Sequence, residues 1–152
     1  MNRIQEVPEA YDLCGQVIGL AMKVHSALGP GYPESVYQNA PIWELRKSGF
    51  NADTERPISV QYDGQIVGAF SADMLTNRSL IVELKASQSL AKAHEVQLVN
   101  YLVATGLDEG LLLNFKADRL EFKKKFRVPK KEEASFWICS SHFVNSVHSV
   151  EK

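Results

Sequence analysis

The chain has 152 residues, enough for one domain that buries a core without disulfides or a structural metal. With 45% apolar residues, 23% charged residues and a net charge of −1, its composition excludes a disordered or membrane-embedded chain. No run approaches the roughly 20 apolar residues of a membrane span, and the acidic N-terminal segment lacks the apolar core of a signal peptide. We therefore expect a cytoplasmic protein with no membrane contact. Its two cysteines have no metal-binding spacing.

Two helices are expected in the first third of the chain. Residues 9–28 repeat apolar side chains at helical spacing and end at Gly29-Pro30-Gly31, a strong breaker. A second helix is expected over residues 33–47. Pro41 lies inside it, where the missing N–H and the ring clash should kink or break the helix.

The apolar period then changes from helical to alternating, which predicts strands. Three strands and their turns are expected over residues 58–62, 65–75 and 80–85, with Asp63-Gly64 as the first turn. A helix over 91–105 and strands over 110–115 and 120–128 follow. The order is helix, helix, three strands, helix, two strands. The two strands on either side of the third helix are expected to be parallel neighbours. The fold class is therefore α/β (α+β), a mixed sheet of about five strands flanked by helices.

One domain is expected over residues 1–129, followed by a C-terminal extension over 130–152. The extension contains aromatic side chains, so it is a candidate for docking, for a homodimer or for a protein partner. Residues 116–131 carry eight basic and two acidic residues, a local charge of +6. Such a run is either a solvated face or a strip that faces phosphates, whose attraction would weaken with salt.

The stretch "FSADMLTNRSLIVELKA" carries the strongest functional signal. Glu83 and Lys85 are two residues apart on a strand, so their side chains share one face. Asp73 precedes Glu83 by ten residues across a short turn, so an antiparallel pair can bring the two carboxylates together. They would repel each other unless a cation lay between them, and carboxylates with water are what Mg²⁺ or Mn²⁺ prefers. The alternative is a salt-bridged hairpin with no metal.

Two further stretches add polar residues near this set. In "HEVQLVNYL", Gln97 and Tyr101 are one helical turn apart, at the edge of the buried face. In "GYPESVY", Glu34 follows a glycine break at the start of a helix, where an acid also simply complements the helix dipole. His94 and Glu95 have no spacing that demands a catalytic role. His25 is expected to be a packed histidine that supports the Gly29-Pro30-Gly31 turn.

Together these stretches resemble a known family. Gly31-x-x-Glu34-x-x-Tyr37 is similar to the motif of the GxxExxY proteins, a branch of the PD-(D/E)XK nuclease superfamily. The segments "VHSALGPGYPESVY", "FSADML", "IVELKA", "HEVQLVNYL" and "GLLLNF" resemble that family in order, over about residues 10–125. The acids, lysine and Gln/Tyr pair further resemble its exonuclease-type branch. The resemblance implies a restriction-endonuclease-like core.

The resemblance also implies a role for each matching residue. Asp73 and Glu83 would be the main ligands of Mg²⁺ or Mn²⁺, the Leu84 carbonyl would add an oxygen, and Glu34 would contribute directly or through water. Lys85 would act on the attacking water. The Gln97 and Tyr101 side chains would line the pocket.

The resulting hypothesis is a metal-dependent nuclease that hydrolyses phosphodiester bonds, with DNA as the expected partner. A second hypothesis is a catalytically silent or partner-dependent accessory protein on the same fold, which the near-neutral charge favours. A purely structural domain would have to hold three acids beside one lysine without a cation, which is electrostatically costly. The chain contains no base-reading module, so the sequence predicts no sequence specificity.

Overall fold

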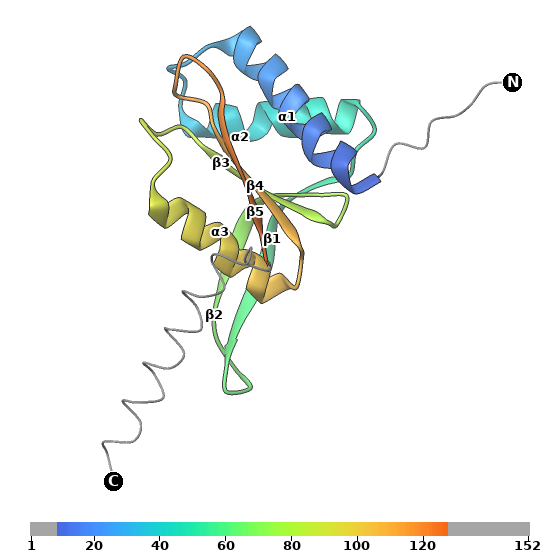
Figure 1. The fold of residues 1–152 in the computed structure, drawn as a ribbon, viewed down its shortest axis with the longest axis vertical. Coiled ribbons are helices and arrows are strands. Elements are labelled where there is room, and N and C mark those ends of the chain that lie inside the picture. Colours follow the sequence, from blue (N-terminus) through green and yellow to red (C-terminus); the bar gives the residue numbers. More distant parts are fainter. Residues whose placement is uncertain (1–8, 128–152) are drawn as a thin grey trace, which may run out of the picture.

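The structure is a computed structural model that describes residues 9–127, with side chains from residue 13 onward. A five-stranded mixed sheet with the strand order β1-β2-β3-β4-β5 forms its centre. Figure 1 shows α1 and α2 grouped together, with α3 standing apart from them. The elements in chain order are α1 (Glu9–Leu28), α2 (Glu34–Lys47), β1 (Ala52–Tyr62), β2 (Gln65–Thr76), β3 (Leu80–Lys85), α3 (Lys92–Thr105), β4 (Glu109–Asn114) and β5 (Glu121–Phe126).

The order of elements and the pairing of strands agree with the sequence prediction. Strands β3 and β4 are parallel and are joined through α3, whereas every other neighbouring pair in the sheet is antiparallel. The fold is therefore α+β with a restriction-endonuclease-like arrangement, as expected. The predicted extension over 130–152, with its docking role, lies outside the described residues.

The two faces of the sheet are covered by different helices. Helices α1 and α2 pack on one face, against a cluster that includes Val82 and Leu84 of β3. Helix α3 packs on the other face, against a second cluster that includes Ile81 of the same strand. Because side chains alternate along a strand, Glu83 and Lys85 point to the face covered by α3. The sheet alternation thus directs the Glu-x-Lys pair toward the helix that carries Gln97 and Tyr101.

Two details of the helices differ from the prediction. Helix α2 runs without interruption through Pro41, which is buried. Tyr37, Ile42 and Leu45 are buried on the same helix, and we attribute its continuity to this packing, which outweighs the loss of one backbone hydrogen bond. On α3, helical spacing of the apolar residues predicts that Val96 lies on the buried face, but Val96 is 45% exposed.

Strands β1 and β2 form a long hairpin whose far half extends beyond the helices (Figure 1). Most residues from 57 to 69 are exposed, including Tyr62 and Ile66. Strand β1 is an edge of the sheet, and it contains Pro57. Glu55 in the same strand has a φ of 52°, a left-handed backbone that is uncommon for a residue with a side chain. Glu55 has no paired residue in the ladder to β2, although Thr54 and Arg56 on either side are paired.

The basic strand β5 makes ion pairs with the rest of the fold. Glu95 of α3 binds both Lys123, at 3.1 Å, and Lys125, at 2.8 Å. Lys124 pairs with Glu109 at 3.3 Å. These three lysines therefore connect the edge strand β5 to α3 and β4 through ion pairs. This pairing favours the solvated, salt-bridged interpretation of the basic run over the phosphate-facing one.

Residues 9–127 contain no helix long and apolar enough to span a membrane.

Candidate functional site

The site lies where β2 and β3 stop pairing through their backbones. Their ladder runs from Thr76–Leu80 to Met74–Val82 and ends there. Beyond it, side-chain carboxylates accept the hydrogen bonds of the backbone. The Leu84 N–H donates to Asp73 Oδ2 at 2.9 Å, and the Asp73 N–H donates to Glu83 Oε1 at 3.4 Å. This point after Met74 and Val82, where β2 and β3 separate, is called the fork below. The fork holds Asp73 and Glu83 next to each other, as the spacing of the hairpin predicted.

Burial makes it unfavourable for both carboxylates of this pair to be charged at the same time. Glu83 is 4% exposed, and burial followed by the charge of Asp73 raises its pKa from 4.5 to about 8. The Asp73 N–H and the ammonium group of Lys85 both lower the pKa of Glu83, but they do not offset the increase. At neutral pH and without a cation, Glu83 therefore holds a proton in most molecules. A positive charge between the two carboxylates would stabilise the charged form of Glu83 and so oppose that shift in pKa.

Helix α3 contributes Gln97 and Tyr101 to the same place. Burial raises the pKa of the Tyr101 hydroxyl, and the charges of Glu83 and Asp73 raise it further, whereas a hydrogen bond with the Gln97 side chain lowers it. The Tyr101 ring stacks on Phe70 of β2, with ring centroids 3.7 Å apart and planes at 14°. Tyr101 thus lies near the two acids, Gln97 contacts Tyr101, and Phe70 packs against the tyrosine ring.

Helix α2 reaches the site from the other side of the sheet. Glu34, at its first turn, accepts a hydrogen bond from the Ala86 N–H at 3.4 Å, just after the end of β3. One turn later, the Gln38 side chain donates to Asp73 Oδ1 at 3.4 Å. Gln38 was not among the residues predicted from the sequence. Its only signal is its position four residues after Glu34, which places both side chains on one helix face.

The loop before α2 is held by the tyrosine of the glycine–glutamate–tyrosine motif. Tyr37 is fully buried and stacks on Phe115, with ring centroids 5.1 Å apart. Its hydroxyl donates to the Gly29 carbonyl and accepts from the Tyr32 N–H at 3.1 Å. Gly31 has a φ of 111°, a conformation that favours glycine. The two ends of the motif thus fix the loop from which Glu34 emerges.

A buried amide fixes the chain after Lys85. The Asn114 side chain accepts from the Ser87 N–H at 3.1 Å and donates to the Ser87 carbonyl at 2.8 Å. The Phe115 N–H donates to the Lys85 carbonyl at 2.9 Å, which extends the pairing of β3 and β4 by one step. Lys85 is half-buried. Its backbone is held by β4 through the Phe115 N–H, and the chain that follows is held by Asn114 through Ser87. Asn114 was also missed from the sequence, because its partner is 27 residues away.

A match to a known protein family identifies the family of this chain. Residues 11–126 match the model of the PD-(D/E)XK nuclease superfamily. The chain belongs to this superfamily. No curated protein matches the chain. Among solved structures, the crystal structure of SSO0001 is similar at 19% identity and a TM-score of 0.45, over 83% of this chain and 66% of that one. The chain thus spans about two thirds of the length of that protein.

Nucleases of the PD-(D/E)XK superfamily typically use divalent metal ions, and the donor set can be tested against that chemistry. Over residues 9–127, no three His, Cys, Asp or Glu side chains form a group that could hold a metal ion. The compact donor set is therefore two carboxylates, Asp73 and Glu83. The Leu84 N–H faces β2, and the N–H and C=O of a strand residue point to the same edge, so its carbonyl lies on that side as well. Hard oxygen donors of this kind fit Mg²⁺ or Mn²⁺, with water completing the coordination.

Three other candidates have structural partners away from the acids. His94 Nδ1 accepts from the Ala91 N–H at 3.2 Å and so caps α3. Glu95 is buried against the lysines of β5. His25 is packed, as expected, but its ring contacts the Ala117 carbonyl at 2.8 Å and so ties α1 to the loop between β4 and β5.

Proposed function

We propose that the protein is a metal-dependent nuclease of the GxxExxY type that hydrolyses phosphodiester bonds in DNA. The observation that carries the proposal is the fork between β2 and β3. It holds two carboxylates together and raises the pKa of Glu83 to about 8. Such an arrangement is unfavourable by itself and becomes favourable when a cation binds. The match to a nuclease superfamily supports the assignment of the reaction.

In this proposal, Asp73, Glu83 and the Leu84 carbonyl would hold Mg²⁺ or Mn²⁺, and Glu34 would contribute directly or through water. A bound divalent ion would supply Lewis-acid polarisation of the phosphate and offset charge that develops in the transition state. The exposed Glu34 carboxylate is anchored by the Ala86 N–H, which keeps it at the mouth of the site. Gln38 restrains Asp73 through its side-chain amide.

Lys85 is the residue that we assign to the attacking water. It lies on the same face of β3 as Glu83, and its ammonium group lowers the pKa of that carboxyl, which supports close approach. Lys85 orients the water so that its oxygen forms a bond to phosphorus while one P–O ester bond breaks. The attacking water gives up one proton, and the leaving oxygen takes up one proton to become a hydroxyl. The products are a phosphate monoester at one end and a hydroxyl at the other. Gln97 and Tyr101 line the opposite wall and position the phosphate.

The accessory-protein alternative is favoured by one observation. All three basic residues of β5 are already paired with Glu95 or Glu109, so the basic run supplies less charge for DNA than the sequence suggested. In that case the fold would contact nucleic acid only together with a partner.

The direct test is cleavage of end-labelled linear and closed circular DNA by the purified protein in Mg²⁺ or Mn²⁺, with EDTA as a control. We expect metal-dependent cleavage that Lys85→Ala reduces by at least about 100-fold, the usual contribution of a positioned acid–base group. Lys47→Ala is the matched control, because this lysine lies on α2 and pairs with Glu44 at 3.0 Å, away from the acids.

The same samples can separate the two candidate functions. Titration calorimetry with Mn²⁺ should show binding that Asp73→Ala abolishes and that Lys47→Ala leaves unchanged. Metal binding without cleavage would support the partner-dependent alternative. Absence of both would refute the proposed metal site.

A further inference from the structure

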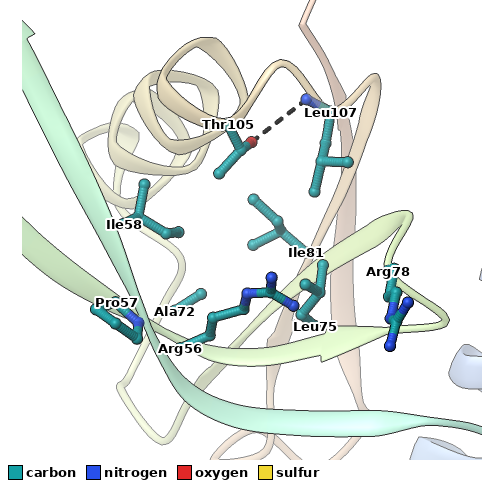
Figure 2. Close-up of a pocket in the computed structure, with 9 residues that line it drawn as sticks. All are labelled: Arg56, Pro57, Ile58, Ala72, Leu75, Arg78, Ile81, Thr105 and Leu107. Atoms are coloured by element: carbon teal, nitrogen blue, oxygen red, sulfur yellow. Dashed lines mark hydrogen bonds between the residues drawn. The ribbon is translucent and has the colours of Figure 1, made fainter.

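A cavity of about 280 Å³ opens on the face of the sheet covered by α3, beside the candidate site. Figure 2 shows it between the end of α3 and strands β1 and β2. Its apolar wall comes from Ile58, Ala72, Leu75, Ile81 and Leu107. This volume is near the lower end of the range for small-molecule pockets, and an apolar lining with a few polar groups is typical of them.

Two arginines also line this cavity, Arg56 of β1 and Arg78 of the turn between β2 and β3. In Figure 2 the Arg56 side chain extends toward Leu75, whereas the Arg78 side chain lies at the rim with its guanidinium group directed outward. Its ion pair with Asp53 is long, at 3.8 Å, and exposed on both sides, so it contributes little. No ion pair of Arg78 occurs within residues 9–127. The cavity therefore combines an apolar wall with two cations that are available to an anion.

The cavity and the candidate site lie along the same helix, α3. Tyr101 lies near the acids, and Thr105, one turn further along the same face, lines the cavity. On the sheet, Ala72 of the cavity wall adjoins Asp73 in sequence. Ile81 of the wall precedes Glu83 by two residues on one face of β3, a separation of about 6.6 Å. A strand bound at the acids would therefore pass the cavity if it followed α3.

We propose that the cavity of Arg56 and Arg78 binds one nucleotide of the substrate strand, at a position next to the phosphate that is cleaved. The two guanidinium groups hold the phosphate of this nucleotide, and the apolar wall contacts its sugar or base. The proposal rests on the proposed nuclease function and adds a subsite that fixes the register of the strand. Neither arginine has a role in the chemical step.

The test measures binding of a short fluorescent DNA oligonucleotide by anisotropy over a series of KCl concentrations. The full-length chain carries Lys85→Ala, so that the oligonucleotide stays intact in Mg²⁺. We expect Arg56→Gln/Arg78→Gln to weaken binding about tenfold at low salt and to reduce the slope of log K against log[KCl] by about 0.7–0.9, the value for one phosphate. Lys23→Gln/Lys47→Gln loses the same charge on the opposite side of the sheet and should change neither quantity.

A second variant separates the pocket from a general effect of charge. Ile58→Trp enlarges a side chain of the wall without changing net charge, and it should weaken binding by filling the cavity. Thermal unfolding and circular dichroism verify that each variant is folded. Inorganic phosphate, added as a competitor, should weaken binding by the Lys85→Ala chain but not by the chain that also lacks both arginines.

The outcomes distinguish this proposal from the proposed function. Equal affinity and equal slope for the arginine and lysine double variants would overturn the subsite, whereas cleavage by the chain with Lys85 intact would still support the nuclease. If the Lys85→Ala chain does not bind the oligonucleotide and the chain with Lys85 intact does not cleave it, both proposals fail together. Weaker binding by Arg56→Gln/Arg78→Gln and by Ile58→Trp, with the lysine control unchanged, supports the subsite.

Discussion

Removing the charge of Glu83 should stabilise the metal-free protein at alkaline pH. The variant Glu83→Gln keeps the shape of the side chain but cannot ionise. In the native chain, burial and the neighbouring Asp73 raise the pKa of Glu83 from 4.5 to about 8. A carboxyl whose pKa is raised on folding contributes stability that is fully present below about pH 4.5 and is lost as the pH rises through about 8.

The size of this effect follows from the shift in pKa. Each pKa unit corresponds to about 1.4 kcal/mol, so the difference between 4.5 and about 8 gives on the order of 3–5 kcal/mol. We therefore expect the free energy of unfolding of the native chain to fall by up to this amount between about pH 5 and about pH 9. The free energy of unfolding of Glu83→Gln should not fall in this way, because its side chain cannot ionise. Glu83→Gln should therefore be more stable than the native chain at about pH 9.

Urea unfolding followed by circular dichroism in EDTA measures both proteins at each pH. Glu121→Gln is the matched control, because Glu121 begins the second Glu-x-Lys triplet of the chain and accepts from Asn114 Nδ2 at 3.3 Å. It should not reproduce the alkaline gain. Adding Mn²⁺ should then stabilise the native chain and not Glu83→Gln, since only the native chain regains a cation between its carboxylates.

Parallel curves for the native chain and Glu83→Gln across the whole pH range would refute the reasoning. They would mean that the two carboxylates are solvated or separated in solution. An alkaline gain in the Glu121→Gln variant would show that the effect comes from net charge rather than from the fork.

Three further substitutions test how the fold supports the site. Glu95→Gln should lower stability by about 1–2 kcal/mol at pH 7 in urea unfolding. Lys125, then Lys123, lower the pKa of Glu95 from 4.5, so this difference should disappear as the pH falls through the lowered pKa. Tyr37→Phe should cost about 1 kcal/mol in the same assay and lower cleavage, because it removes the hydroxyl that joins the Gly29 carbonyl to the Tyr32 N–H. Gly110→Ala should cost about 1–3 kcal/mol in thermal unfolding, because its Cβ would lie 2.8 Å from Leu98 Cδ1.

Each of these results has a clear opposite. A Glu95→Gln deficit that persists in acid would show that the ion pairs with β5 are not its source. Full cleavage by Tyr37→Phe would separate the loop from the positioning of Glu34. Unchanged thermal stability of Gly110→Ala would mean that Leu98 moves without cost.

The sequence could predict those parts of the site that depend on short stretches of chain. Asp73 and Glu83 are separated by one turn, so strand alternation and hairpin geometry sufficed to bring them together. Gln97 and Tyr101 needed only helical spacing and the expectation that their helix would cover the sheet. Their roles in metal binding and catalysis stay predictions.

The sequence could not predict features that depend on contacts between distant elements. The separation of β2 from β3 arises because side chains replace backbone partners at the fork, which no local pattern encodes. Gln38 reaches Asp73 across 35 residues, and Glu95 reaches Lys123 across 28. Nothing in the sequence of the basic run, residues 116–131, indicated that Glu95 of α3 would form ion pairs with its lysines. Pro41 was misjudged for the same reason, since local propensity was weighed without the packing around it.

The two outer strands of the sheet differ in how they prevent further strand addition. On β1, Pro57 removes a backbone donor, and the left-handed Glu55 interrupts the flat ladder that another chain would need. On β5, successive lysines would repel an identical strand. The protein can therefore expose a long apolar hairpin without offering a template for fibres. Replacing Pro57 by a β-branched residue would weaken this protection, so association of chains through the edge strand should begin at a lower protein concentration.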